Sequence, residues 1–311
     1  MSSEHPHGRV STSLLALGLV LGLVLILIFV GIRYKDSGPV LQDFIGNMAR
    51  KLELLSGMRA NLMNSEQAEK SAVMADTDEA SRDFADQSRR AGDVVDRDLR
   101  ELESLFHRDP TDKEMKLFHE FDSCWTELRK IDREILGFAV QNTNLKAAAL
   151  SFGQGNEAMK RFEQALKKLI HSNSSLSSEK CGQVVILASD ALAAGLRIHN
   201  LHAPHIAEAR DERMDEIERE MRQAGAIVDA SIKKLADLVA GEDRASLQDA
   251  KAAYDEFAAV TAEVIKLSRE NTNIKSFELS LGKKRKIAAQ CDEILVGLQE
   301  AVRNREFKAT R

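Results

Sequence analysis

The stretch QNTNLKAAALSFGQ, residues 141–154, is written a second time as ENTNIKSFELSLGK, residues 270–283. Between positions 142 and 153, seven of the twelve residues are identical in the two copies, which lie 129 residues apart (271 − 142). The shared residues that open and close the phrase are Asn142, Thr143, Asn144 and Gly153 in the first copy, and Asn271, Thr272, Asn273 and Gly282 in the second. Such a repeat predicts one structural unit that is present twice.

Apolar residues upstream of each copy recur at alternating spacings of three and four residues. This is the heptad spacing of helices that pack along one seam. The composition agrees, because 4 Pro and 5% aromatic residues beside 30% charged residues are typical of long helices. No stretch has the period-two pattern of a strand, so we predict an all-α fold. The seam residues are Phe121, Cys124, Leu128, Ile131, Ile135 and Phe138 in the first copy, and Ala250, Ala253, Phe257, Val260, Val264 and Leu267 in the second.

Polar breaks divide the sequence around each copy into four segments of helical pattern. Four amphipathic helices with short connections pack as an antiparallel four-helix bundle. Between the copies, the stretch HSNSSLSSEK from His171 is small and polar, which is typical of a joint or linker. We therefore predict two tandem antiparallel four-helix bundles, at residues 38–172 and 178–307.

The repeated phrase has two interpretations. In the first, the third helix of each bundle ends at Asn-Thr-Asn, whose side chains cap the fourth helix. Gly153 and Gly282 then lie inside the fourth helix, at a close approach to a neighbouring helix. In the second, the third helix runs on to Gly153, so that Asn142 and Asn271 are buried polar residues that fix the helix register. Matched helix lengths favour the first interpretation.

Residues 14–32, LLALGLVLGLVLILIFVGI, carry no charge. As a helix they span about 28 Å, close to the hydrocarbon thickness of a membrane. The apolar run ends in RYKDSG rather than in a small-residue cleavage site, so we predict an uncleaved single-pass transmembrane helix after a tail of residues 1–13. The flanking cations favour a cytoplasmic location of the bundles, although long domains cross a membrane despite such a bias.

Three widely spaced cysteines, Cys124, Cys181 and Cys291, do not suggest a disulfide framework. Cys124 and Cys291 fall at apolar helical positions, where we expect them to be buried as small hydrophobic residues. The sequence has no P-loop, GxGxxG, HExxH or GxSxG pattern, so we predict no catalytic activity and no cofactor. The net charge of -5 gives no basic patch that would bind nucleic acid.

Three of the eight histidines stand within seven residues, as His199, His202 and His205. At a spacing of three on a helix, neutral imidazoles share a face on which they can hold Zn, Cu or Ni. Pro204 disturbs this helix and redirects His205, and no fourth ligand is evident. The alternatives are a solvated polar face that is rich in histidine and a cluster that titrates near neutral pH.

The segments that carry the repeated phrase resemble a known family. Residues 134–169, EILGFAVQNTNLKAAALSFGQGNEAMKRFEQALKKL, and residues 263–298, EVIKLSRENTNIKSFELSLGKKRKIAAQCDEILVGL, are similar to the last two helices of the four-helix-bundle sensory domain of bacterial methyl-accepting chemotaxis proteins. The apolar anchor, and Trp125 and Leu128 on the preceding helix, add to this resemblance. The first two helices match only in their pattern.

The resemblance implies a non-catalytic, ligand-binding homodimer of the bacterial inner membrane, with periplasmic bundles. Because the sequence shows no HAMP linker and no signalling hairpin, we expect it to act through a partner such as a histidine kinase or a chemoreceptor. A structural adaptor that holds a membrane complex together is the alternative. In family members that bind small anions, arginines on the first helix often clamp the ligand. Arg59 and Arg197, on the first helices of the two copies, are therefore the candidate ligand-binding residues.

Overall fold

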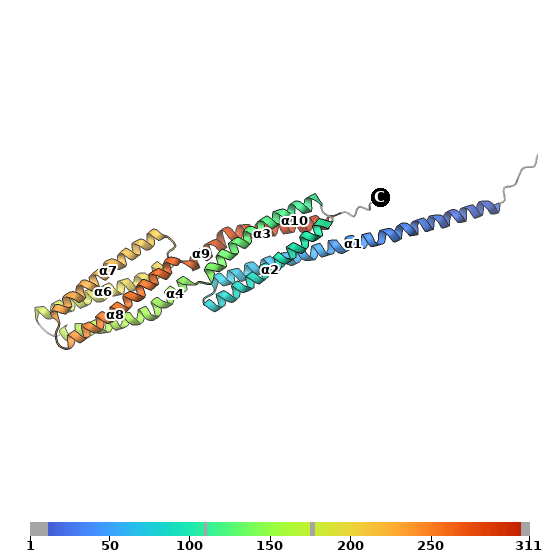
Figure 1. Cartoon of the computed structure of the whole chain (residues 1–311). Coiled ribbons are helices and arrows are strands. Elements are labelled where there is room, and N and C mark those ends of the chain that lie inside the picture. Colours follow the sequence, from blue (N-terminus) through green and yellow to red (C-terminus); the bar gives the residue numbers. More distant parts are fainter. Residues whose placement is uncertain (1–11, 109–110, 175–177, 306–311) are drawn as a thin grey trace, which may run out of the picture. The chain divides into compact units, whose positions relative to one another are not determined.

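The computed structural model describes residues 12–108, 111–174 and 178–305. Every regular element in this part of the chain is a helix, and no strand occurs in it (Figure 1). The prediction of an all-α fold is therefore confirmed. The elements are α1 (Thr12–Met74), α2 (Asp78–Arg108), α3 (Asp112–Ala139), α4 (Thr143–Leu150), η1 (Ser151–Gly155), α5 (Asn156–Ser174), α6 (Glu179–Ala207), α7 (Asp211–Leu238), α8 (Glu242–Glu270), α9 (Thr272–Leu279), η2 (Ser280–Lys284) and α10 (Arg285–Arg303).

The chain divides into two compact units, and the division falls inside four of the helices. Unit 1 takes residues 1–61, 94–123 and 291–311, and unit 2 takes residues 62–93 and 124–290. Helices α1, α2, α3 and α10 therefore contribute segments to both units, whereas the run from α4 to α9 belongs wholly to unit 2.

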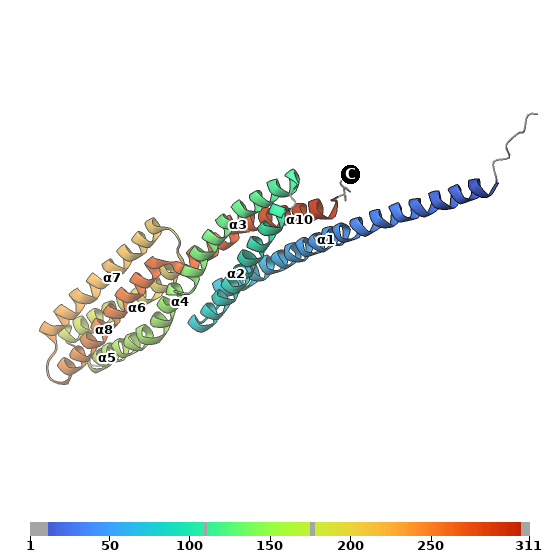
Figure 2. The same ribbon diagram turned by 45° about the vertical axis from the view of Figure 1, so that its right-hand side comes forward.

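A four-helix bundle within unit 2 is built from α6, α7, α8 and the run α4–η1–α5 (Figures 1 and 2). Helices α5 and α6 both pack on α8, and α6 also packs along α7. Their apolar faces share one core, in which the rings of Phe162 on α5 and Phe257 on α8 are fully buried. Gly195 on α6 permits the close approach of α5, because a Cβ at this position would lie 2.9 Å from Phe162 Cε1.

The position of α5 corrects the predicted domain boundaries. The predicted tandem arrangement places residues 38–172 in one bundle and residues 178–307 in the other. In the structure, α5 shares its core with α6, α7 and α8, so the small polar stretch around Ser178 connects neighbouring helices of one bundle. A heptad seam marks the face of a helix that is buried. It does not specify which of two similar sets of helices covers that face, and the fourth helix of the first copy packs with helices of the second.

The rest of unit 2 contains the end of α1, the start of α2, the end of α3 and the α9–η2 run. The buried Ser65 and Ser88 join α1 to α2, since their hydroxyl oxygens lie 3.0 Å apart. Ser81 Oγ lies 2.8 Å from the carbonyl oxygen of Ala72 and 3.1 Å from that of Ala139, which ties α2 to both α1 and α3. Hydrogen bonds of serine hydroxyl groups thus join α1, α2 and α3 in this part of unit 2.

In unit 1, segments of α1, α2, α3 and α10 pack together. Arg50 on α1 donates two hydrogen bonds, of 2.8 and 2.9 Å, to the carboxylate of Glu101 on α2. Helix α3 begins with a capping box, in which Thr111 and Glu114 each accept a hydrogen bond from the other's backbone N–H at 3.2 Å. A capping box satisfies two donors that the first turn of a helix leaves free, which explains why α3 begins here.

The predicted transmembrane segment, residues 14–32, lies within α1 as backbone, but its side chains are outside the described part of the chain. Residues 1–11 of the predicted tail are also outside it. Among the residues that the structure describes, Glu179–Ala207 is the one helix long and apolar enough to cross a membrane. This helix is α6, which packs on three neighbours in the bundle of unit 2, so its apolar composition has an explanation in the core.

The cysteines differ from the expectation in one respect. Cys124 and Cys291 are buried, as predicted, but both are disulfide-bonded, whereas Cys181 is free. The sequence argument against disulfides was therefore wrong, because spacing along the chain does not report the distance between residues on different helices. A structural disulfide is a feature of proteins that fold in an oxidising compartment.

Candidate functional site

The repeated Asn-Thr-Asn forms two equivalent turns in unit 2. Asn142 stands between α3 and α4 with φ 52°, and Asn271 stands between α8 and α9 with φ 55°. Both residues are thus in the left-handed region, which asparagine tolerates better than most residues. The chain turns at the repeated phrase, as the first interpretation predicted, and the bundle of α4 to α8 begins and ends at these two turns.

Each copy of the phrase caps the helix that follows the other copy. The backbone N–H of Thr143 donates to Thr272 Oγ1, and that of Thr272 donates to Thr143 Oγ1, both at 3.2 Å. In the same way the N–H of Asn144 donates to Asn273 Oδ1 at 3.1 Å, and that of Asn273 donates to Asn144 Oδ1 at 3.2 Å. The first-turn N–H groups of a helix need such acceptors. Neither Asn142 nor Asn271 caps its own helix with its side chain, so the predicted local capping is replaced by reciprocal capping.

Side-chain amides join the two copies further. Asn144 Nδ2 donates to Asn271 Oδ1 at 2.7 Å, and Asn273 Nδ2 donates to Asn142 Oδ1 at 3.0 Å. Asn142, Asn144 and Asn271 are all buried. A buried polar network in which the members find partners rigidifies the structure around it. Thr143 and Asn144 thus bind their counterparts in the other copy, while Asn142 and Asn271 each bind the other copy's third residue. We call residues 142–144 and 271–273 the junction.

The junction is also anchored to its surroundings. Asn142 Nδ2 donates to Asp78 Oδ1 at 3.0 Å, and Asn271 Nδ2 donates to the carbonyl oxygen of Glu208, also at 3.0 Å. The hydrogen bond from Asn142, and then that from Lys146, lowers the pKa of Asp78 below its usual value. Asp78 opens α2 and Glu208 ends α6, so each turn is held by a neighbouring helix end.

A π-helical turn follows each copy of the junction at the corresponding position. These turns are η1 and η2, and their first residues, Ser151 and Ser280, are 129 residues apart (280 − 151). Gly153 and Gly282 lie inside them, exposed, and a Cβ on either would meet nothing within 4 Å. The predicted close approach at these glycines is therefore wrong. π-Turns are rare and frequently occur at functional sites.

His202 forms a buried polar contact with η1. Its Nδ1 lies 2.9 Å from Ser151 Oγ, and its Nε2 lies 3.1 Å from Thr261 Oγ1. Thr261 donates its only hydroxyl proton to the carbonyl oxygen of Phe257 at 2.9 Å, so it accepts from His202 and the imidazole carries its proton on Nε2. Burial, followed by the neighbouring His199 and His205, lowers the pKa of His202 to about 4. This histidine is therefore neutral at physiological pH.

A pH titration tests this assignment of His202. The native state does not accept the proton that the unfolded chain takes up below its ordinary pKa of about 6.5. Stability is therefore full above that value and is lost as the pH falls toward 4. We expect the wild type to lose about 2 kcal/mol through this residue between pH 7 and 4.5. His202→Gln should lack this part of the loss, measured as melting temperature against pH. Parallel curves for the two proteins would contradict the assignment.

A charged cluster lies next to η2. Lys284 Nζ is 2.7 Å from Glu69 Oε2 and 2.6 Å from Asp132 Oδ1, and all three side chains are buried. The repeat aligns them with the layer just described, because 284 − 155 and 261 − 132 are both 129. For the first two helices of each copy the offset is 133, as between the ends of α1 and α6 (207 − 74), and 202 − 69 is also 133. Their counterparts are Gly155, Thr261 and His202. A neutral hydrogen-bonded layer beside η1 thus corresponds to an ion cluster beside η2.

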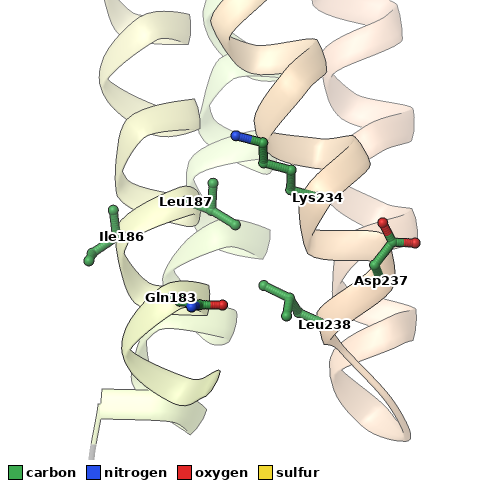
Figure 3. A pocket seen from close by; sticks show the side chains of 6 residues that line it. All are labelled: Gln183, Ile186, Leu187, Lys234, Asp237 and Leu238. Carbon is green, nitrogen blue, oxygen red and sulfur yellow. The ribbon is translucent and has the colours of Figure 1, made fainter. Parts of the chain in front are cut away.

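A cavity of about 450 Å³ lies between α6 and α7 of unit 2 (Figure 3). Its volume falls in the range of sites for small molecules. Three lining side chains come from α6 and three from α7, and they combine an apolar surface with one cation, one anion and one amide. The lining residues are Gln183, Ile186, Leu187, Lys234, Asp237 and Leu238.

Comparison with known proteins gives the family. A family model described as a four helix bundle sensory module for signal transduction matches residues 13–182, which is more than half of the 311 residues. The chain belongs to this family. A search of the curated proteins found no match. The matched range of the sensory module contains the first copy of the junction, and the resemblance to the sensory domain of chemotaxis receptors is thereby confirmed.

The two arginines proposed as ligand clamps of the sensory module bind carboxylates of the protein. Arg59 donates from Nε and Nη2 to Asp292 at 2.6 and 3.1 Å within unit 1, and this hydrogen bonding raises the pKa of its guanidinium. Arg197 Nη2 donates to Glu220 at 3.1 Å on the surface of unit 2. A small anion would have to compete with these carboxylates, so the ligand role of both residues stays a prediction.

The three histidines of the sensory module do not converge. His199 Nε2 lies 3.3 Å from the carbonyl oxygen of Ser151, and His205 lies 2.8 Å from Ser268 Oγ and 3.1 Å from Glu218 Oε1. Within residues 12–108, 111–174 and 178–305, no group of three or more His, Cys, Asp or Glu side chains is placed to hold a metal ion. His202 and His205 are fully buried, so these two side chains do not lie on a solvent-exposed face.

Sequence reasoning missed the residues around the two π-turns. Glu69, Asp132 and Lys284 are of residue types that usually lie exposed on helices, so no pattern singled them out. A signal was available for Asp132, because the 129-residue offset aligns it with Thr261, and both follow an apolar seam position directly. Nothing in the sequence around Lys284 distinguishes it from its exposed neighbour Lys283.

Proposed function

We propose that this sensory module is a membrane-anchored, non-catalytic receptor that binds a small ligand and passes the signal to a partner protein by helix displacement. The observation that carries the proposal is the match of residues 13–182 to a sensory module for signal transduction. The apolar residues 14–32, read as a transmembrane anchor, support the membrane attachment.

The junction gives the displacement a route within unit 2. Helix α8 reaches Asn271 at its end, and α4 starts after Asn142. Because the two turns are hydrogen-bonded to each other, a shift of α8 against α4 acts directly on the start of α9. The end of α3 is tied to the same point through the turn at Asn142. A rigid, reciprocal contact of this kind transmits a small movement instead of absorbing it.

A ligand screen tests the receptor function. The cavity between α6 and α7 is the site we expect to be occupied. Amino acids, organic acids and metal ions are added to the full chain in detergent, and the melting temperature is measured. A ligand at 100 times its Kd stabilises the protein by about 2.7 kcal/mol. Gln183→Trp, which places a large side chain between α6 and α7 (Figure 3), should abolish the shift, whereas Ile227→Trp, at an exposed position outside the lining, should keep it. If no compound shifts the wild type, the alternative of a structural adaptor is favoured.

We place the bundles in the periplasm of a bacterium, with the anchor in the inner membrane. The disulfide-bonded state of Cys124 and Cys291 supports an oxidising compartment, against the count of flanking positive charges. Alkaline phosphatase fused after Arg311 should be active in intact cells, and β-galactosidase at the same position should be inactive. The opposite pair of results would place the bundles in the cytoplasm.

We also propose that the protein acts as a homodimer with a signalling partner, either a histidine kinase or a chemoreceptor. The family description supports this, since a sensory module serves signal transduction. Crosslinking in membranes, with and without a ligand from the screen, measures both associations. A chain that stays monomeric and uncrosslinked in both conditions would exclude this part of the proposal.

A further inference from the structure

The cluster of Lys284, Glu69 and Asp132 has an unbalanced charge. Two carboxylates face one ammonium group, so the ionised cluster carries one net negative charge. The exposed fractions of the side chains are 2%, 0% and 4%, so water does not screen this charge. A buried charge is costly unless it is paired and hydrogen-bonded. The cluster therefore lacks one positive charge.

Two carboxylate oxygens of this cluster also lack a hydrogen-bond donor. Glu69 Oε1 is buried without any hydrogen-bond partner. Asp132 Oδ1 lies within ion-pair distance of Lys284 Nζ but accepts no hydrogen bond of normal geometry. The cluster thus lacks a hydrogen-bond donor as well as a positive charge, and a proton on a carboxyl group supplies both.

Other charged groups on the surrounding helices pair at the surface instead. Lys70 on α1 pairs with Glu66, Arg89 on α2 with Asp86, Arg129 on α3 with Asp93, and Lys283 on η2 with Glu127. At least one partner of each pair is substantially exposed. These four cations therefore have carboxylates of their own.

We propose that the cluster is a proton-binding site, in which one proton is shared by the carboxyl groups of Glu69 and Asp132 while Lys284 remains an ammonium. Two carboxylates that share one buried site do not both ionise readily. The proton comes from solvent when the chain folds, and the folded cluster is then neutral. This inference does not depend on the proposed receptor function, because it concerns the native state without ligand.

Glu114 in unit 1 provides a matched control. It is fully buried like Glu69, and its Oε1 also lacks a hydrogen-bond partner. Its carboxylate, however, lies 3.6 Å from Lys51 Nζ and 3.7 Å from Arg305 Nη1, so it has two cations beside it. The same substitution of glutamate by glutamine should therefore have opposite effects at the two positions.

The experiment compares the full chain in detergent with Glu69→Gln and Glu114→Gln at pH 7.5. Glutamine imitates a protonated carboxyl group, so Glu69→Gln should raise the melting temperature by about 2–4 °C. Glu114→Gln removes a buried carboxylate that pairs with two cations and should lower the melting temperature. If Glu69→Gln also lowers the melting temperature, the proposal is overturned, because the native protein is then more stable with Glu69 as an anion.

Proton linkage provides a second measurement. A proton that the folded cluster holds and the unfolded chain releases makes the stability depend on pH. The native state then binds more protons than the unfolded state, and the wild type should lose stability as the pH rises. Glu69→Gln should lack this loss, and the infrared carbonyl band of a protonated carboxylic acid should disappear with it. Equal pH dependence and equal spectra in both proteins would overturn the proposal.

Discussion

Lys284→Met should destabilise the protein by about 3–5 kcal/mol, which is the cost of removing one partner from a buried ion pair. The substitution keeps most of the side-chain volume but leaves Glu69 and Asp132 facing each other without the ammonium group. The loss appears as a lower melting temperature of the full chain in detergent. The stability of unit 2 thus depends on one lysine that looks ordinary in the sequence.

The neighbouring lysine is the control for this prediction. Lys283 pairs with Glu127 at 3.1 Å, and both side chains are more than half exposed. An exposed ion pair contributes about 0–1 kcal/mol, so Lys283→Met should leave the melting temperature almost unchanged. Similar shifts for the two variants would show that the burial of Lys284 has no energetic consequence.

Thr143→Val and Thr272→Val should each cost about 1–3 kcal/mol, because each removes the acceptor of a buried backbone N–H on the opposite copy. Valine keeps the shape of threonine, so the hydroxyl group is the main loss. The double variant should cost less than the sum of the single variants by about 1 kcal/mol, since the two hydroxyls also contact each other at 3.2 Å. Melting temperatures of the four proteins complete the double-mutant cycle.

Thr111 gives the comparison for this cycle. It caps its own helix, α3, in the ordinary way, and has no hydrogen-bond partner in common with Thr272 among the described residues. Thr111→Val should therefore cost about 1 kcal/mol and should combine additively with Thr272→Val. Additive behaviour of Thr143→Val with Thr272→Val would show that the two hydroxyl groups are not coupled, and single variants without any loss of stability would refute reciprocal capping.

The sequence allowed the helices and the junction to be predicted, because these depend on local chemistry. The heptad seams set the buried faces, and Asn142 and Asn271 mark turns since asparagine accepts a left-handed backbone. The partner of each helix was not predictable, because the repeat makes two sets of helices almost equally suitable for α5. The fourth helix of one copy therefore lies in the bundle of the other.

Buried polar groups were the second limit of prediction. His202, Glu69 and Lys284 are charged or polar residue types that are exposed on most helices, and their burial follows from tertiary packing alone. The disulfide-bonded state of Cys124 and Cys291 depends in the same way on which helices are adjacent. The local sequence pattern indicates neither the burial of these polar groups nor the disulfide-bonded state of the two cysteines. The polar layers beside the π-turns could therefore be identified only from the fold.

The reciprocal capping means that the segment from Thr143 to Glu270 starts and finishes at one place, with Thr143 N and Thr272 Oγ1 only 3.2 Å apart. A segment with adjacent ends can be excised, and a short loop from α3 to α9 would then close the gap without stretching the chain. The remaining helices α1, α2, α3 and α9–α10 would follow one another in the order of a simple up-and-down bundle. The order of the elements along the chain is that of a tandem duplication, in which the fourth helices of the two copies, α4–η1–α5 and α9–η2–α10, have exchanged places.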